Sequence, residues 1–207
     1  MKKIFIILII FLSSCSPSDD NKKSDKNSNN TIEISGEIKR ISVGNTDAKI
    51  RIIAYESLTC SHCANFHKDV YPKLKKEYID TGLAKIEFRH FPLDIAALNA
   101  SKVSQCNSDT NLEILESLYS NQQAWVKGNT AEEVNINLKK FLEKEGFEID
   151  FEKCIDNKEI EDFVLNDRIE GAKKFDVNAT PTIIINDKKF EKSLNYKNLK
   201  KSLEKLI

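Results

Sequence analysis

The chain has 207 residues, and its 32 basic side chains balance 32 acidic ones. A chain of this length can bury a full core in one domain. The sequence contains no basic cluster and no nucleic-acid-binding motif, so we expect no nucleic-acid partner and a surface of mixed, solvated charges.

The N-terminus has the pattern of an export signal. Lys2 and Lys3 precede an unbroken apolar run from Ile4 to Leu12, which is too short to span a bilayer but typical of a signal peptide. Leu12-Ser13-Ser14-Cys15 resembles a bacterial lipobox, which implies a signal over residues 1–14 and lipid attachment to Cys15. The alternative is an ordinary signal peptide with an incidental cysteine. Both predict export to a compartment where disulfides persist.

A polar segment follows the lipobox. Residues 16–30 consist of Ser, Asn, Asp, Lys and one Pro, without a hydrophobic side chain. Such a segment cannot bury a core, so we expect residues 15–30 to form a disordered tether that spans roughly 20 Å. The tether would hold a folded domain, residues 31–207, away from a membrane surface.

Two cysteines mark a junction between a strand and a helix. Lys49–Tyr55 is rich in β-branched and aromatic residues and predicts a buried strand. An amphipathic helix is predicted downstream by Cys63, Phe66, Val70 and Leu74. Free N–H groups and the dipole at a helix N-terminus stabilise an anion, so Cys60 should be an exposed, reactive thiol. Cys63 lies one turn deeper, and His62 between them adds positive charge when it is protonated.

A close cysteine pair has other uses that must be weighed. It can be half of a zinc site, which needs two further ligands, or a purely structural disulfide. Cys106 and Cys154 are isolated in the sequence, and His67 could supply one ligand at most. The pattern therefore favours redox chemistry, which requires neither a metal nor an organic cofactor.

The rest of the chain alternates between strand and helix patterns. Ile32–Ile34 is a candidate edge strand, and the helix with Cys63 should continue to about Thr81, with a kink at Pro72. Lys85–Phe91 alternates as a second strand, so strand–helix–strand predicts a right-handed parallel unit.

A helical block and a hairpin complete the domain. Residues 94–176 have helical spacing, including a capping box from Thr130 to Glu133. Thr182–Ile185, the turn Asn186-Asp187 and Lys188–Phe190 predict a β-hairpin. A last helix is expected to place on one face Tyr196, Leu199, Leu203 and Leu206.

This order resembles an α/β thioredoxin fold with an inserted helical subdomain, as in the DsbA family of exported thiol:disulfide oxidoreductases. Three stretches carry the resemblance, especially to proteins of alphaproteobacterial type: Ser57-Leu58-Thr59-Cys60-Ser61-His62-Cys63-Ala64, Arg89-His90-Phe91-Pro92-Leu93-Asp94 and Ala179-Thr180-Pro181-Thr182. The resemblance implies that Cys60 is the nucleophile, Cys63 the buried resolving cysteine and His62 the usual histidine between them. It also implies that Pro181 is a cis-proline facing the site and that Thr180 binds the substrate backbone.

One position departs from the family pattern. Many relatives have an acidic residue six positions before the first cysteine, where this chain has Ala54. Glu56 lies two residues further on and therefore on the same face of the strand. Glu56 either replaces the missing acid as a proton shuttle for the buried thiol or is simply solvated near the strand end.

The remaining cysteines and histidines, Cys106, Cys154, His67 and His90, are assigned no part in the redox reaction. The resemblance implies a second disulfide, between Cys106 and Cys154, and the alternative is two separate buried thiols. Such a bond would close a loop of about fifty residues and stabilise the fold by about 3–4 kcal/mol. His67 and His90 are interpreted as structural or surface residues.

The implied activity is transfer of the Cys60–Cys63 disulfide to unfolded or reduced exported proteins, on the periplasmic side of a bacterial membrane. The resemblance implies reoxidation by a quinone-linked membrane partner of the DsbB type. Isomerase or reductase activity with the same site is an alternative, because direction depends on potential and partner. A metal-binding lipoprotein of thioredoxin fold and a lipoprotein that only binds peptides are further alternatives.

Overall fold

A five-stranded mixed sheet forms the centre of this computed structural model, which describes residues 38–107, 109 and 111–207. The strand order is β1-β3-β2-β4-β5, where β2 and β3 are parallel and the other neighbours are antiparallel. The strands are β1 (Ile41–Gly44), β2 (Ile50–Glu56), β3 (Ala84–His90), β4 (Thr182–Ile185) and β5 (Lys188–Lys189). The parallel strand–helix–strand unit expected from the sequence is confirmed.

The helix that joins β2 to β3 alternates between α- and π-helical turns. Its segments are α1 (Ser61–Asn65), η1 (Phe66–Val70), α2 (Tyr71–Leu74) and η2 (Lys75–Ile79). Pro72 has no N–H to donate to the preceding turn, and the irregularity expected there takes the form of the π-helical turn η1. The helix ends at Ile79, slightly before the expected Thr81, and Gly82 then takes a positive φ of 77°.

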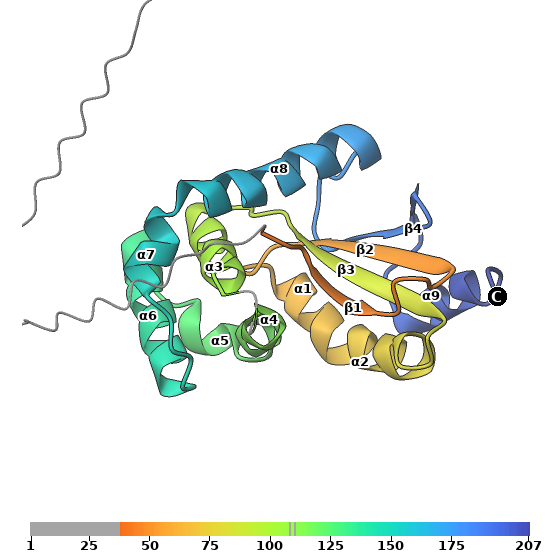
Figure 1. Cartoon of the computed structure of the whole chain (residues 1–207), viewed down its shortest axis with the longest axis horizontal. Helices are drawn as coiled ribbons and strands as arrows, with labels where there is room; N and C mark the ends of the chain where they lie inside the picture. The colour runs from red at the N-terminus through yellow and green to blue at the C-terminus, as the bar shows by residue number, and fades with distance from the viewer. Residues whose placement is uncertain (1–37, 108, 110) are drawn as a thin grey trace, which may run out of the picture. The chain divides into compact units, whose positions relative to one another are not determined.

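Among the described residues, six helices lie between β3 and β4. Figure 1 shows α3 to α7 gathered beyond one end of the sheet, while α8 returns along it and packs against β3. The helices are α3 (Ile95–Gln105), α4 (Asn111–Ser120), α5 (Gln122–Trp125), α6 (Ala131–Lys144), α7 (Phe151–Asp156) and α8 (Lys158–Phe175). Side chains cap four of them at their N-termini: Asp94, Thr130, Asp150 and Asn157.

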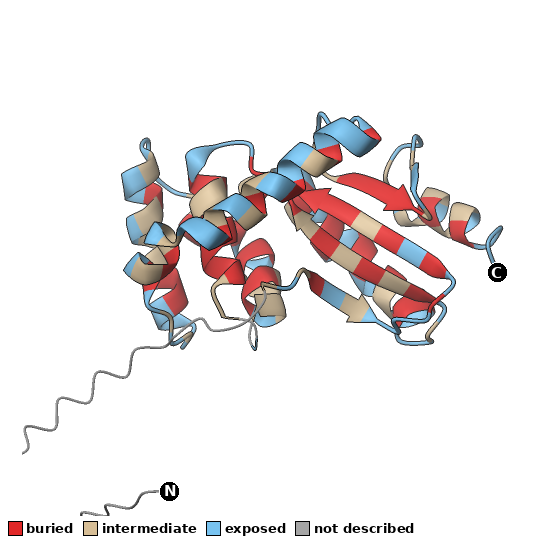
Figure 2. Cartoon of the chain, turned by 45° about the horizontal axis from the view of Figure 1, so that its top comes forward, coloured by how far each residue is buried: buried red, intermediate tan, exposed pale blue. Residues whose placement is uncertain are grey.

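The core lies on both faces of the sheet, because successive strand residues point to opposite faces. Ile52 and Ala54 of β2 face the cluster that contains the active-site helix, whereas Tyr55 faces Phe175 of α8. Figure 2 shows the central strands as largely buried. Gly171 lets α8 approach β2 closely, since an added Cβ there would lie 2.6 Å from the Tyr55 ring.

The β4–β5 hairpin and the last helix were both predicted from the sequence. The β4–β5 hairpin is confirmed, and its turn residues Asn186 and Asp187 take positive φ values of 46° and 62°, as tight hairpin turns require. Helix α9 (Tyr196–Leu203) stops before Leu206, so the prediction of Leu206 on its buried face is wrong. Leu206 is 40% exposed because the chain has left the helix by then.

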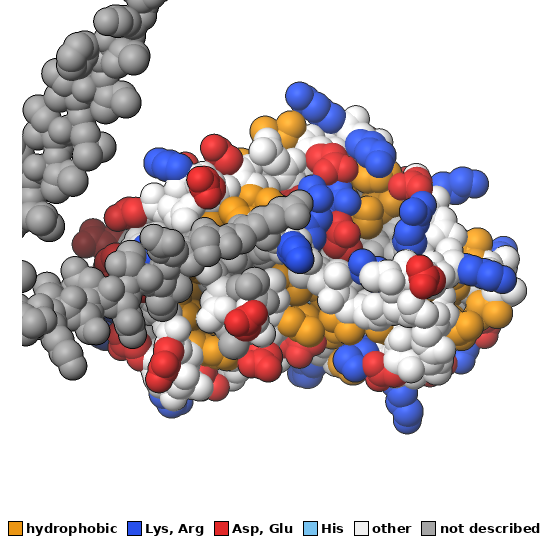
Figure 3. All heavy atoms as spheres, viewed as in Figure 1, with side chains coloured by type: hydrophobic (Ala, Val, Ile, Leu, Met, Phe, Trp, Pro, Cys, Tyr) orange, Lys and Arg blue, Asp and Glu red, His pale blue; other side chains and the backbone are white. Residues whose placement is uncertain are grey.

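Strand β1 lies at the edge of the sheet, next to β3. Strand β1 was not predicted, because four residues are too short for a clear alternation, and the predicted strand Ile32–Ile34 lies outside the described residues. Within the described part of the chain, no helix combines the length and apolar character needed to cross a bilayer. Basic and acidic side chains are interspersed on the face seen in Figure 3.

Candidate active site

Cys60 occupies the N-cap of α1, at the end of the loop that leaves β2. Its carbonyl accepts the backbone N–H groups of Cys63 and Ala64 at 3.1 and 3.2 Å, which starts the helix. Its Sγ donates to the carbonyl oxygen of Thr180 at 3.4 Å. Cys60 is partly exposed and Cys63 is fully buried, and both are free thiols in this structure. The reactive and the protected sulfur are thus placed as the sequence predicted.

The two thiols ionise very differently. A hydrogen bond from the Cys63 thiol is the main cause that lowers the pKa of Cys60 to about 5, against the opposing effect of burial. The Thr180 side chain and the backbone N–H groups of Cys63 and His62 lower it further. Burial, followed by the hydrogen bond with Cys60, raises the pKa of Cys63 far above its usual range. Cys60 is therefore the thiolate of the pair.

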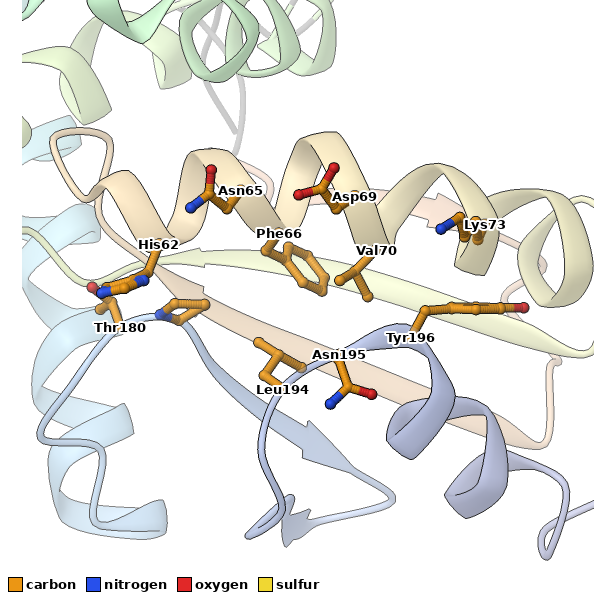
Figure 4. A pocket seen from close by; sticks show the side chains of 11 residues that line it. His62, Asn65, Phe66, Asp69, Val70, Lys73, Thr180, Leu194, Asn195 and Tyr196 are labelled. Atoms are coloured by element: carbon orange, nitrogen blue, oxygen red, sulfur yellow. The ribbon is translucent and has the colours of Figure 1, made fainter.

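The loop before β4 faces the cysteines. The Thr180–Pro181 peptide bond is cis, and Thr180 supplies the carbonyl that Cys60 contacts. His62 has an exposed side chain, and Figure 4 shows it beside Thr180 at one end of a groove. Its effect on the pKa of Cys60 comes from its backbone N–H. The structure therefore brings together Cys60, Cys63, His62, Thr180 and Pro181.

The groove has a volume of about 600 Å³ and runs between the active-site helix and the segment leading into α9. Lys73 lies over the Tyr196 ring, 5.9 Å from its centroid, at the end away from His62. The lining combines apolar and polar side chains: His62, Asn65, Phe66, Asp69, Val70, Lys73, Thr180, Pro181, Leu194, Asn195 and Tyr196. Such a lining can accommodate an extended peptide next to Cys60.

Glu56 lies beneath the cysteines and is buried rather than solvated, with only 3% of its surface exposed. Burial raises the pKa of its carboxyl, and the nearby His67 opposes this shift. The Oε2 atom lies 2.8 Å from Nε2 of His67. The nearby Tyr119 hydroxyl also lowers the pKa of Glu56. The other carboxylate oxygen of Glu56, Oε1, has no hydrogen-bond partner. Of the two alternatives, the solvated one is wrong, because the Glu56 side chain is buried next to His67 and Tyr119.

His67 is a part of the site that the sequence analysis missed. It had been assigned as structural or surface, whereas it is buried against Glu56. The one available signal was spacing: Cys63 and His67 are four residues apart and so share a face of the helix. His90 is also buried, and its pKa falls to about 4 because burial disfavours the charged imidazole. Of the two predicted alternatives for His67 and His90, structural or surface residues, the surface position is therefore wrong.

The helical insertion holds the loop that carries Cys60. Gln122 of α5 donates from Nε2 to the carbonyl oxygens of Leu58 at 2.8 Å and Cys60 at 3.0 Å. Thr59 donates to the carboxylate of Asp94 at 2.7 Å, and Asp94 also caps α3. The insertion therefore fixes the entry to α1 from a part of the chain that lies far away in sequence.

The other cysteines lie away from this site. Cys106 and Cys154 form a disulfide between the end of α3 and α7, with a Cα–Cα distance of 5.6 Å, which is the pairing the resemblance implied. Cys15 lies outside the described residues. Among residues 38–107, 109 and 111–207, no three His, Cys, Asp or Glu side chains form a group that could hold a metal ion.

Comparisons with known proteins agree with this geometry. The family described as Thioredoxin matches residues 37–205. The crystal structure of alpha-DsbA1 from Wolbachia pipientis is 31% identical with a TM-score of 0.71, covering 80% of this chain and 89% of that chain. A "putative protein-disulfide oxidoreductase" of Rickettsia bellii is 32% identical over 148 residues, which are 70% of this chain and 56% of that protein. "Disulfide bond formation protein D" of Bacillus subtilis is 29% identical over 180 residues, 79% of this chain and 75% of that protein.

A cysteine pair at a helix start, opposite a cis-proline, defines a thioredoxin-fold protein with a dithiol site. The chain belongs to the DsbA-like thiol:disulfide oxidoreductases within the thioredoxin family. The predicted α/β thioredoxin-like fold with an inserted helical subdomain is confirmed. The chain spans little more than half, 56%, of the length of the Rickettsia bellii relative.

Proposed function

We propose that the protein is an exported oxidase that transfers the Cys60–Cys63 disulfide to reduced exported proteins. The observation that supports this most is the contrast between the two thiols: Cys60 is partly exposed with a pKa of about 5, whereas Cys63 is buried. A stabilised Cys60 thiolate favours the reduced enzyme and is a good leaving group. The oxidised enzyme is therefore expected to be a strong oxidant.

The transfer follows from the positions of the sulfurs. A substrate thiolate attacks Cys60 Sγ, the Cys60–Cys63 bond breaks, and its electron pair passes to the sulfur of Cys63. The second substrate thiolate then attacks the substrate sulfur of the mixed disulfide, and Cys60 leaves as a thiolate. The substrate has lost two electrons and gained a disulfide, and the enzyme holds two reduced cysteines.

Glu56 is the proposed proton shuttle for Cys63. A thiolate at Cys63 would be a buried, uncompensated charge, which is costly. The carboxyl of Glu56 is buried nearby, and its charge raises the pKa of the Cys63 thiol. Glu56 thus takes the role of the acid that relatives carry at the position of Ala54, from the same face of β2.

Substrate binding is assigned to Thr180, Pro181 and the groove beside them. Thr180 lies against Cys60, which supports a role for its backbone in hydrogen bonding to an extended peptide. His62 borders the same end of the groove.

The export signal and the lipobox support the proposed location. Lipid attached to Cys15 would anchor the domain through the tether on the periplasmic side of a bacterial membrane. A membrane partner of the DsbB type is proposed as the oxidant that restores the disulfide, since transfer to a substrate leaves the enzyme reduced.

The reduction potential of the Cys60–Cys63 pair tests the direction of the reaction. We would equilibrate the protein with glutathione buffers, trap the thiols and measure both species by mass spectrometry, with a Cys60→Ser variant as the control. A potential well above that of thioredoxin, about −270 mV, supports the oxidase. A potential near that value identifies an isomerase or reductase instead. Failure to form the disulfide at all overturns the redox function and brings metal binding or peptide binding forward.

A further inference from the structure

His67 makes close contacts on all sides although the proposed reaction gives it no role. Its side chain is 4% exposed, and Nε2 lies 2.8 Å from Oε2 of Glu56. Its ring stacks on Tyr119 of α4, with centroids 4.0 Å apart and an interplanar angle of 16°. The rings of Phe66, Tyr71 and Phe88 enclose the imidazole further, with centroids 5.2 to 5.6 Å away. The ring is therefore fixed in one orientation.

The hydrogen-bonding groups of His67 define its tautomer. The buried Nδ1 atom has no partner, so a proton there would be an unsatisfied buried donor. A bare lone pair at Nδ1 leaves no donor unsatisfied, whereas a proton on Nε2 is used in the bond to Glu56. The favoured neutral tautomer thus donates from Nε2 to the carboxylate.

His67 and the buried thiol are connected through the same short stretch of chain. Cys63 and His67 are one helical turn apart, and His67 lies in the π-helical turn η1. The backbone of Ser57, which directly follows Glu56, forms a hydrogen bond with the Cys63 thiol. Glu56 thus contacts the imidazole directly, and its charge acts on the thiol that must gain or lose a proton.

From this geometry we propose that His67 is a positioning residue of the redox site, which orients Glu56 beneath Cys63 and stabilises its carboxylate form by donating from Nε2. The proposal rests on the proposed function, because it concerns the proton that Cys63 exchanges. His67 touches neither substrate nor sulfur, and it acts only through Glu56.

Each breaking or forming of the Cys60–Cys63 bond is accompanied by transfer of a proton between Glu56 and Cys63. When substrate attack breaks the Cys60–Cys63 bond, a proton passes from Glu56 to the Cys63 sulfur, and His67 stabilises the resulting carboxylate. On reoxidation by a disulfide, Cys60 forms the mixed disulfide and releases one thiolate of the oxidant. Cys63 returns its proton to Glu56 and attacks Cys60 Sγ, which forms the Cys60–Cys63 bond and releases the second thiolate.

Other titratable groups surround the pair. Burial raises the pKa of Tyr119 and of Tyr71, so neither phenol ionises near neutral pH. His90 of β3 pairs in register with Glu56, and its pKa of about 4 keeps it neutral. Cys60 is a thiolate above about pH 5. Above that pH, Glu56 is the group near Cys63 whose charge His67 can control.

The test measures reoxidation of the reduced full-length protein by oxidised glutathione as a function of pH. In His67→Phe, the Glu56 carboxylate loses its donor and Glu56 keeps its proton to higher pH. We expect the rate of Cys60–Cys63 formation to fall about tenfold at pH 7 and its midpoint to move up by about one pH unit. His67→Gln keeps an amide donor and should restore most of the wild-type profile.

Two controls separate this role from packing. Tyr71→Phe removes a buried hydroxyl next to His67 without touching Glu56, and should leave the profile unchanged. His67 is not among the largest causes of the low pKa of Cys60, so thiolate absorbance should show a Cys60 titration close to that of the wild type in all variants. A folded His67→Phe protein with the wild-type pH profile would overturn the proposal and leave the oxidase function intact. A wild-type protein that never forms the disulfide would overturn both.

The wild-type protein gives a second test that needs no variant to fold. The ¹⁵N shift of His67 Nε2 should follow the protonation of Glu56 in the reduced protein, with a different midpoint in the oxidised protein. An Nε2 shift that does not change between about pH 4 and pH 9 in either form shows a purely structural histidine and overturns the proposal.

Discussion

Cys60 and Cys63 lie at the start of a helix, three positions apart, whereas Cys106 and Cys154 are separated by 48 positions and join two helices. The first pair has one partly exposed sulfur next to Thr180 and an acid, Glu56, beneath it. The second pair belongs to the helical insertion, and Cys154 is only 1% exposed. The comparison shows that the surroundings of a cysteine pair determine whether its disulfide is exchanged or kept.

The largest effect is expected from Cys60→Ser, which removes the attacked sulfur of the exchangeable pair. Thiol–disulfide exchange with a reduced peptide should fall by on the order of a thousandfold or more, because Cys63, the other free thiol among the described residues, is buried. Peptide oxidation followed by mass spectrometry measures this loss. Peptide oxidation as fast as that of the wild type would show that the Cys60 sulfur is not the one that the substrate attacks.

The second disulfide should contribute to stability and leave exchange unaffected. Replacing both Cys106 and Cys154 by Ala opens a long loop, and the free energy of unfolding should fall by about 3–4 kcal/mol in the chain-entropy model. Urea unfolding of the two proteins measures the difference. A loss of peptide oxidation in the folded variant would contradict the separation of roles between the two pairs.

A smaller effect should appear in the pH dependence of stability of the reduced protein. The pKa of Cys60 falls from an ordinary 9.0 to about 5 on folding, so its thiolate stabilises the folded state above the unfolded pKa. This contribution is lost as the pH falls from about 9 towards 5, and solvent screening reduces it because Cys60 is partly exposed. The oxidised protein has no such thiol.

Urea unfolding of the reduced and oxidised forms between about pH 5 and 8 isolates this contribution. Over that range the Cys63 thiol of the reduced protein stays protonated in the folded and in the unfolded state. Glu56 titrates with a different midpoint in the two redox forms, so the same comparison is made in a Glu56→Gln background. The stability of the reduced form relative to the oxidised form should decrease steadily towards pH 5. A difference independent of pH would contradict the low pKa of Cys60.

The Cys60–Cys63 pair was easy to predict from the sequence. The residues that contact it from distant parts of the chain were difficult to predict. The apolar strand, the helical spacing and the Cys60–Cys63 motif are local patterns, so the junction and the exposure of the two sulfurs could be inferred. Thr180 and Pro181 could be placed only by resemblance, because the contact with Cys60 spans 120 positions. Local sequence patterns predict a helix or a strand, but not the distant residues that it contacts in the fold.

Glu56 and His67 show this limit most clearly. From the sequence, Glu56 was equally consistent with a solvated strand end, and His67 resembled any residue on a helix next to the core. Part of their enclosure comes from Tyr119, which belongs to the insertion and stacks on the imidazole. No periodicity within β2 or the active-site helix contains that information.

The smallest effect tests whether the insertion also holds the exchangeable pair in place. Gln122→Leu leaves the buried carbonyl oxygens of Leu58 and Cys60 without their side-chain donor, which should cost about 1–2 kcal/mol of stability. Because those carbonyls belong to the turn that places the Cys60 sulfur, peptide oxidation should slow by a few-fold as well. Gln123→Leu is the matched control, since Gln123 is the exposed neighbour on the same helix and should change neither. If Gln122→Leu and Gln123→Leu behave alike in urea unfolding and in peptide oxidation, Gln122 does not hold the entry to α1. The insertion then supports that loop through Asp94 and the redox site through Tyr119.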